Sequence, residues 1–322
     1  MNWRSTTFSN PVTIVALAAV AALLAYVFGS GGYLVTVVGF AAIYAIFCTG
    51  LNFFMGYTGQ ASFGQNAFAA LGGYGSAILT VGLGWEPLVA LVVSMAFSGL
   101  VALIVGYPTL RLRGHYLAMA TFALGLITYE LSIELTSLTK GYMGYSGIPP
   151  LGIGKVELAT DQQQLIALII VLLAGVWIAN RLKDSRFGRA LRAIAGSEPA
   201  ALALGINVAR YKLAAFVIAA VYASVAGSLF AHFVGFISPE VFGLSMVVLS
   251  FTMLYLGGIG TIWGPVVGAI IVSLMPELFR GLKELQDLAY CSVLILMLIF
   301  APRGLAALPG LFARRNQTGN KS

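Results

Sequence analysis

A run of polar side chains and glycines between residues 52 and 66 is the part of this sequence best suited to bind a small solute. It interrupts a stretch that is otherwise apolar enough for a membrane helix. Irregular backbone at such a point exposes N–H and C=O groups, which can bind the carboxylate and ammonium groups of a solute. A polar turn that joins two hairpin helices at the inner membrane surface is the alternative, and the residues by themselves favour neither. The candidate residues for a solute path are Asn52, Tyr57, Gln60, Ser62, Gln65 and Asn66.

Side chains that could act as catalysts or metal ligands are few and scattered. Glu130 and Glu134 lie one helical turn apart near the outer end of a predicted span, where we expect them to be hydrated rather than paired. The two histidines, His115 and His232, are far apart in the sequence and are interpreted as interfacial residues, while both cysteines lie in apolar runs. We therefore predict no catalytic residues, no metal site and no disulfide.

The composition excludes a water-soluble domain. Hydrophobic residues make up 59% of the 322 residues and charged residues only 9%, whereas soluble proteins carry about 25% charged residues. The 38 glycines follow no Gly-X-Y period. The net charge of +7 is scattered among apolar segments instead of lying on one soluble face, so no nucleic-acid partner is expected.

Apolar runs long enough to cross a bilayer recur along the whole chain. A span needs about 20 residues because the hydrocarbon core is ~30 Å thick. The fold class predicted is all-α, a polytopic integral membrane protein with about ten transmembrane helices and a range of roughly eight to ten. The runs lie near 12–29, 33–55, 61–82, 88–106, 115–138, 164–180, 211–236, 243–257, 264–279 and 288–302.

The positions of the basic residues predict the orientation. Most of the 18 lysines and arginines fall on one side if both termini, 107–114 and 181–210 are cytoplasmic, as the positive-inside rule requires. The glycine- and proline-rich segment 139–163 is then an external loop. The first run is interpreted as an uncleaved span because no A-x-A cleavage pattern follows it. The chain is predicted to form a single transmembrane domain, 1–322.

Two spans carry small residues at four-residue spacing. Such stripes let helix backbones approach closely in lipid, where no hydrophobic force drives helices together. We interpret them as packing faces without chemistry of their own. They are Ala215, Ala219, Ala223, Gly227 and Ala231 in one span, and Ala90, Ser94, Ser98, Ala102 and Gly106 in the other.

The loop 181–210 contains a short helix signal outside the predicted spans. Ser197 is a favourable N-cap, Glu198 suits a first turn and Gly205 suits the C′ position. The residues between, 200–204, are apolar although the topology places them in the cytoplasm. Such a helix can dock into a partner's groove, and the alternative is a helix that lies on the lipid surface.

Three segments of the chain resemble one family of transport proteins. They are GLNFFMGYTGQASFGQNAFAALGGYGSAIL at 50–79, GRALRAIAGSEPAALALGIN at 188–207 and YLGGIGTIWGPVVGA at 255–269. Together they are similar to the M-type permease subunits of bacterial branched-chain amino-acid ABC importers, over roughly residues 35–305. The glycine-rich turn in the third segment is interpreted as a tight turn.

The resemblance implies an inner-membrane importer of several subunits. Its expected partners are a second, unlike permease of the H type, two ATP-binding cassette subunits, a periplasmic amino-acid binding protein and membrane lipid. The sequence has no G-x-x-x-x-G-K-[ST] loop, so ATP hydrolysis would belong to the partners and no cofactor is expected in this chain. An internal inverted repeat is left open. The residues expected to couple to the ATPase are Ser197, Glu198, Ala200, Ala201 and Gly205, with Pro199 departing from the family's E-A-A pattern.

Leucine, isoleucine and valine are the substrates that the resemblance implies, and related importers of urea or short-chain amides remain an alternative. An ion-coupled secondary transporter is a second alternative, although such proteins place ionisable groups deep in the membrane. An integral membrane enzyme is a third, but it would need converging catalytic groups.

Overall fold

The computed structural model describes residues 33–153, 156–158 and 160–278, together with the isolated positions 292 and 295. The predicted spans near 12–29 and 288–302 lie outside its continuous ranges, as do both termini and Cys291. The elements are α2 (Tyr33–Thr58), α3 (Gln65–Ala77), the π-helical η1 (Ile78–Gly82), α4 (Pro87–Thr109), α5 (His115–Glu134), α6 (Thr136–Thr139), η2 (Gly141–Met143), β1 (Tyr145–Ser146), β2 (Gly152–Ile153), β3 (Val156–Glu157), α7 (Asp161–Asp184), α8 (Arg186–Gly196), α9 (Glu198–Ala203), α10 (Val208–Val234), β4 (Phe236–Ile237), η3 (Pro239–Phe242), α11 (Leu244–Gly257) and α12 (Gly264–Leu278).

The described residues form a helical bundle, which confirms the predicted fold class at that level. Among them, six helices are long and apolar enough to cross a membrane: α2, α4, α5, α7, α10 and the stretch from η3 to the end of α11. Two further predicted spans, near 61–82 and 264–279, form shorter helices, α3 with η1 and α12. The total of about ten spans stays a prediction.

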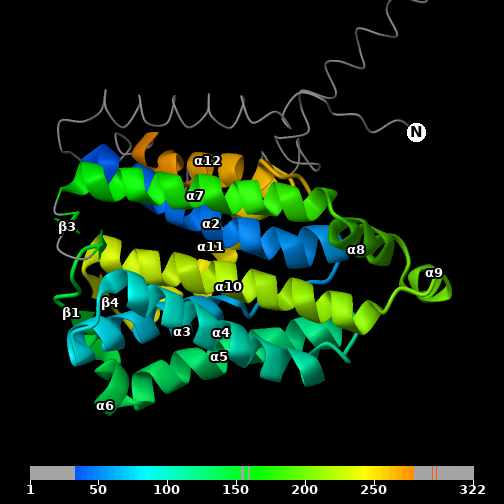
Figure 1. The fold of residues 1–322 in the computed structure, drawn as a ribbon, viewed down its shortest axis with the longest axis horizontal. Coiled ribbons are helices and arrows are strands. Elements are labelled where there is room, and N and C mark those ends of the chain that lie inside the picture. The colour runs from blue at the N-terminus through cyan, green and yellow to red at the C-terminus, as the bar shows by residue number, and fades with distance from the viewer. Residues whose placement is uncertain (1–32, 154–155, 159, 279–291, 293–294, 296–322) are drawn as a thin grey trace, which may run out of the picture.

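Helix α10 runs through the middle of the bundle. It packs against α2 on one side and against α3 and α4 on the other, while α7 and α12 cover α2 (Figure 1). Helix α5 lies beside α3. Because α3 is surrounded by other helices, its amides and hydroxyls face protein instead of lipid, which is where a membrane protein tolerates them.

The two ends of the bundle carry different structures. Helices α8 and α9 follow α7 at one end, and α6, β1, β3 and β4 lie at the other (Figure 1). At that second end β1 pairs antiparallel with β4, so the segment predicted as an external loop is folded onto β4. Within the same segment, β2 pairs antiparallel with β3. The loops 139–163 and 181–210 therefore lie at opposite ends of the bundle, and their assignment to the outside and the cytoplasm stays a prediction.

The predicted small-residue stripes are buried packing faces. The buried residues of α4 are the five of its predicted stripe, and all five stripe residues of α10 are buried. At the centre, a Cβ on Gly227 would overlap the carbonyl of Ala69 in α3, and one on Gly72 would overlap the Ser224 carbonyl in α10. The Ser228 hydroxyl adds a hydrogen bond of 2.8 Å to the Gly72 carbonyl. Close backbone approach thus joins α3 to α10.

This packing predicts a strong asymmetry between two alanine substitutions. Gly227→Ala should destabilise the protein by about 1–3 kcal/mol, because the new methyl group forces α10 away from α3. Gly99→Ala is the matched control, since a Cβ there meets its nearest neighbour, Val221 Cγ2, at an ordinary 3.4 Å. Thermal unfolding of the detergent-solubilised protein measures both. Equal midpoints for the two variants would contradict the close approach.

Candidate functional site

Helix α9 is a short, well-capped element at the end of the bundle. The Ala200 N–H donates to Ser197 Oγ at 3.4 Å, which confirms the predicted N-cap. At the other end the N–H of Ile206 donates to the Ala201 carbonyl at 3.0 Å and that of Gly205 to Leu202 at 2.9 Å. This pair of bonds is a Schellman motif, and Gly205 fills its left-handed C′ position with φ +78°.

The two faces of α9 have different surroundings. Its inner face is Ala201, which is 1% exposed and packs in a small cluster with Ile194 of α8 and Val208 of α10. Its outer side carries Leu202 and the C-cap residue Leu204, which are 55% and 79% exposed. A fixed base and an exposed apolar outer face are suited to docking. Ala201, which was predicted from the sequence to couple to the ATPase, therefore lies on the inner face of α9, whereas Leu202 and Leu204 are exposed.

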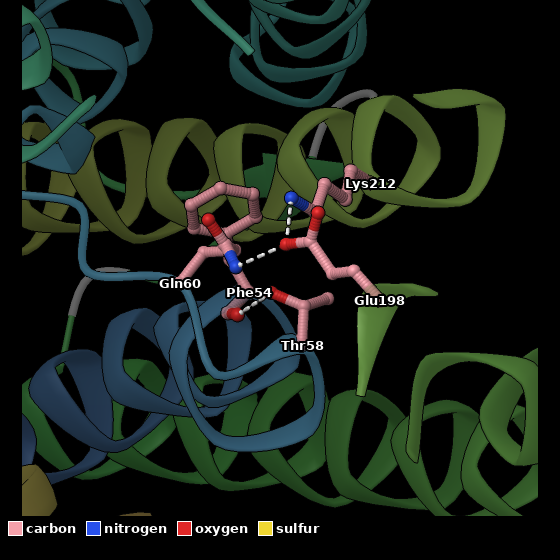
Figure 2. A network of polar contacts seen from close by, with 5 residues as sticks. All are labelled: Phe54, Thr58, Gln60, Glu198 and Lys212. Atoms are coloured by element: carbon pink, nitrogen blue, oxygen red, sulfur yellow. Dashed lines mark hydrogen bonds and ion pairs between the residues drawn. The ribbon is translucent and has the colours of Figure 1, made fainter. Parts of the chain in front are cut away.

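An ion pair ties α9 to the bundle. The Glu198 carboxylate, at the first position of α9, pairs with the Lys212 ammonium of α10. The same Oε1 atom accepts a hydrogen bond of 3.0 Å from Gln60 Nε2, which comes from the segment that joins α2 to α3. Figure 2 shows Gln60 and Lys212 reaching Glu198 from two different elements, beside the end of α2 at Thr58. One carboxylate therefore links α9 to both α10 and the segment 59–64.

Burial makes this link hard to break. The Lys212 residue is only 3% exposed, and an unpaired buried charge costs several kcal/mol. The Glu198 side chain is 25% exposed, so it could be hydrated without its partner. Detachment of α9 would therefore be unfavourable mainly because it would leave the Lys212 ammonium buried without a partner. Sequence reasoning missed this residue as a site residue because its partner lies 14 positions away in another helix.

The irregular backbone predicted for 52–66 is confined to 59–64. Helix α2 continues through Asn52 and Tyr57 and ends at Thr58, and α3 begins at Gln65. The Phe63 N–H donates to Thr121 Oγ1 of α5 at 3.1 Å, and Gly64 lies directly against the Thr121 carbonyl. The segment thus connects two helices at the α9 end, as a turn does, and also packs inside the bundle against α5.

Asn52 explains why α2 need not break. Its Nδ2 donates to the Thr261 carbonyl at 2.7 Å, and its Oδ1 accepts from the Gly260 N–H at 2.8 Å. Both bonds hold the turn between α11 and α12, which confirms that the second glycine-rich segment is a tight turn. This buried amide is satisfied by backbone groups of a distant loop.

The remaining candidate path residues are buried, and several have unpartnered polar atoms. These are the hydroxyls of Tyr57 and Ser62, both amide atoms of Gln65, and Asn66 Oδ1. Ser62, Gln65 and Asn66 border one small hollow together. Asn52 and Gln60 do not border this hollow; Asn52 bonds the turn between α11 and α12, and Gln60 bonds Glu198. The role of all six residues in a solute path stays a prediction.

Other residues considered from the sequence have simple surroundings. Glu130 and Glu134 are exposed. His232 is buried, and its Nδ1 lies 2.8 Å from the Pro149 carbonyl, so that nitrogen carries the proton and Nε2 accepts from Ser76 Oγ at 2.7 Å. His232 therefore fastens the loop 139–163 to α3. Among the described residues, no group of histidine, cysteine and carboxylate side chains could hold a metal ion.

The match to a family model decides the class of protein. Residues 33–302 match the model described as branched-chain amino acid transport system / permease component. The chain belongs to this family. Members of this permease family are transport subunits rather than enzymes, and the apolar helices agree with a multi-pass protein of the bacterial inner membrane.

Individual relatives support the same assignment for this permease. It is 33% identical over 292 residues to the high-affinity branched-chain amino acid transport system permease protein LivM of Salmonella typhimurium. The alignment covers 82% of this chain and 67% of the relative. It is 32% identical to LivM of Escherichia coli, with the same coverage. It is 28% identical to LivH of Escherichia coli, over 83% of this chain and 92% of the relative. No solved structure matches the permease significantly.

The ion pair yields a test of how α9 is attached. Glu198→Ala should lower the stability of the permease by about 1–3 kcal/mol, because it leaves the Lys212 ammonium buried without a partner. Adding Lys212→Met should restore most of the loss, since the double variant has no unpaired charge. Asp184→Ala removes an exposed carboxylate nearby and serves as the control. Thermal unfolding in detergent compares the variants, and a double variant no more stable than Glu198→Ala would refute the role of the pair.

Proposed function

We propose that this chain is the M-type permease subunit of an ABC importer for branched-chain amino acids. The observation that supports this most directly is α9, a capped helix with an exposed apolar outer face whose first residue is ion-paired to the bundle. The relatives LivM and LivH are named as permeases of high-affinity branched-chain amino acid transport systems. Leucine, isoleucine and valine are accordingly the proposed substrates.

The proposed assembly contains several other subunits. This chain is similar to both LivM and LivH, which supports a second, H-type permease of the same fold beside it. Since the sequence has no phosphate-binding loop, two ATP-binding cassette subunits would supply hydrolysis and would dock on α9. A periplasmic binding protein would deliver the amino acid at the opposite end, on the side of the loop 139–163. Both termini and the loop 181–210 would then lie in the cytoplasm.

The proposed mechanism is alternating access driven by the ATPase. Leu202 and Leu204 would seat in a groove of the cassette subunit, and closure of the two cassettes would displace α9. Because Glu198 is bonded to both Lys212 and Gln60, the displacement would reach α10 and the segment 59–64 together. Movement of that segment relative to α5 would change the opening of the solute path.

The buried polar groups support this mechanism over an ion-coupled one. Among the described residues the buried polar side chains are hydroxyls, amides, one histidine and Lys212, with no aspartate or glutamate. A proton or sodium relay uses buried carboxylates in the spans. The described part of the membrane region therefore favours transport driven by ATP hydrolysis in partner subunits over transport driven by an ion gradient.

Uptake by the reconstituted importer tests the proposed function. Proteoliposomes that contain this chain, the second permease, the cassette subunits and enclosed ATP should take up labelled leucine in the presence of the binding protein. Isoleucine and valine should compete, whereas urea and acetamide should not. Leucine uptake driven by a proton or sodium gradient, without ATP or partner subunits, would contradict the proposal.

The outer face of α9 yields a separate test of docking. Leu204→Asp should weaken association with the cassette subunits by at least about tenfold, because a charge enters an apolar contact. Leu138→Asp is the matched control, since Leu138 is exposed in α6 at the opposite end of the bundle. Co-purification of the cassette subunits with each permease variant provides the measurement. Equal recovery with both variants would count against α9 as the docking element.

A further inference from the structure

A cavity of about 290 Å³ lies between α3, α5, η3 and α11. It borders the irregular segment 59–64 through Phe63, and it reaches the surface at Leu126, Glu240 and Leu244, which are exposed. Its volume equals that of roughly ten water molecules in the liquid. A molecule the size of a small amino acid therefore fits inside.

An amide side chain with an unpartnered oxygen borders this cavity. Asn66 is 4% exposed, and its Nδ2 donates to the Phe242 carbonyl at 2.8 Å, which fixes the orientation of the side chain. Its Oδ1 has no hydrogen-bond partner. That oxygen lies over Gly125 in the cavity wall, where an added Cβ would come within 2.7 Å of it. The lack of a side chain at Gly125 thus leaves room for an acceptor that is held in place and has no partner in the protein.

Two more acceptors line the same cavity. They belong to Glu240 of η3 and Tyr129 of α5, two lining residues whose carboxylate and hydroxyl oxygens can accept a hydrogen bond. Together with Asn66 Oδ1 they form a wall that accepts hydrogen bonds and carries one negative charge. Such a wall matches a primary ammonium group.

The N-terminus of α11 forms a wall of opposite character. Gly243, Leu244 and Ser245 border the cavity, and no side chain caps this helix. The first N–H groups of a helix have no partner within it, and the helix dipole favours a negative group beside them. A carboxylate is the natural ligand for this wall.

The remaining lining is apolar. Phe122, Leu126 and Val247 contribute to it, and Phe63 is held by a stack on Phe251 with ring centroids 4.5 Å apart. An aliphatic side chain would remove this surface from water.

We infer that this cavity binds a small aliphatic amino acid as a zwitterion, with the carboxylate at the N-terminus of α11 and the ammonium at Asn66 Oδ1 and Glu240. This inference rests on the proposed function and assigns its solute a place in the fold. The cavity opens to the surface, so the bound amino acid can leave, which suits a site on a transport path.

Cysteine labelling of the assembled importer tests the site. Leu126→Cys is introduced into a chain whose Cys48 and Cys291 are replaced by alanine, and its reaction with a thiol reagent is followed in proteoliposomes. L-Leucine should slow the reaction at least about threefold when its concentration exceeds the dissociation constant twofold. Isocaproate, which lacks the ammonium group, and isoamylamine, which lacks the carboxylate, should protect much less. Labelling unaffected by leucine, or slowed equally by all three compounds, would overturn the site.

A pair of tryptophan variants gives an independent readout. Leu126→Trp fills the cavity and should reduce ATP-dependent leucine uptake about tenfold, while Ile127→Trp, at an exposed neighbour outside the cavity, should leave uptake within about twofold of the unmodified importer. Co-purification of the partner subunits with both variants shows that they fold. Equal uptake by the two variants, in an importer that transports leucine, would overturn the site and leave the proposed function standing. Absence of leucine uptake by the unmodified importer would overturn the proposed function, and with it the ligand assigned here.

Discussion

The ion pair between Lys212 and Glu198 is the contact on which the proposed coupling depends. The Lys212 ammonium is buried in the bundle, where a charge without a partner is strongly unfavourable. Its partner carboxylate belongs to α9 and also accepts a hydrogen bond from Gln60. In the proposed mechanism, a force applied to α9 would therefore be resisted by a buried charge and would be passed to α10 and to the segment 59–64.

Close packing decides which parts can move together. Helices α3, α4 and α10 meet through small residues, and α3 and α10 approach so closely that a Cβ on either would overlap a carbonyl group of the other. Such an interface transmits motion as a rigid body, because it has no room to deform. Helix α5 borders a cavity on the side toward α11, so rearrangement is easier there. The cavity also adjoins the segment 59–64 through Phe63, which places the coupling elements and the inferred solute site next to one another.

Local features of the sequence predicted much of this structure. Four-residue spacing of small side chains identified the buried faces of α4 and α10, since helical periodicity is a local property. Ser197 and Gly205 predicted the ends of α9 for the same reason. The partners of Asn52, Asn66 and Lys212 could not be predicted, because these side chains bond groups in elements that the chain brings together only on folding. The cavity likewise depends on four elements, and Glu240 carried no signal of its own.

Hydrogen–deuterium exchange of the assembled importer tests the central claim, that α9 and the segment 59–64 respond as one unit. Exchange of backbone amides in both regions is compared with and without nucleotide trapped in the cassette subunits, in the unmodified permease and in the double variant Glu198→Ala/Lys212→Met, which has lost both the ion pair and the hydrogen bond to Gln60. The account predicts that trapping changes the exchange of both regions in the unmodified protein, and that of α9 alone in the variant. A response of α9 that leaves residues 59–64 unchanged in the unmodified protein would contradict it.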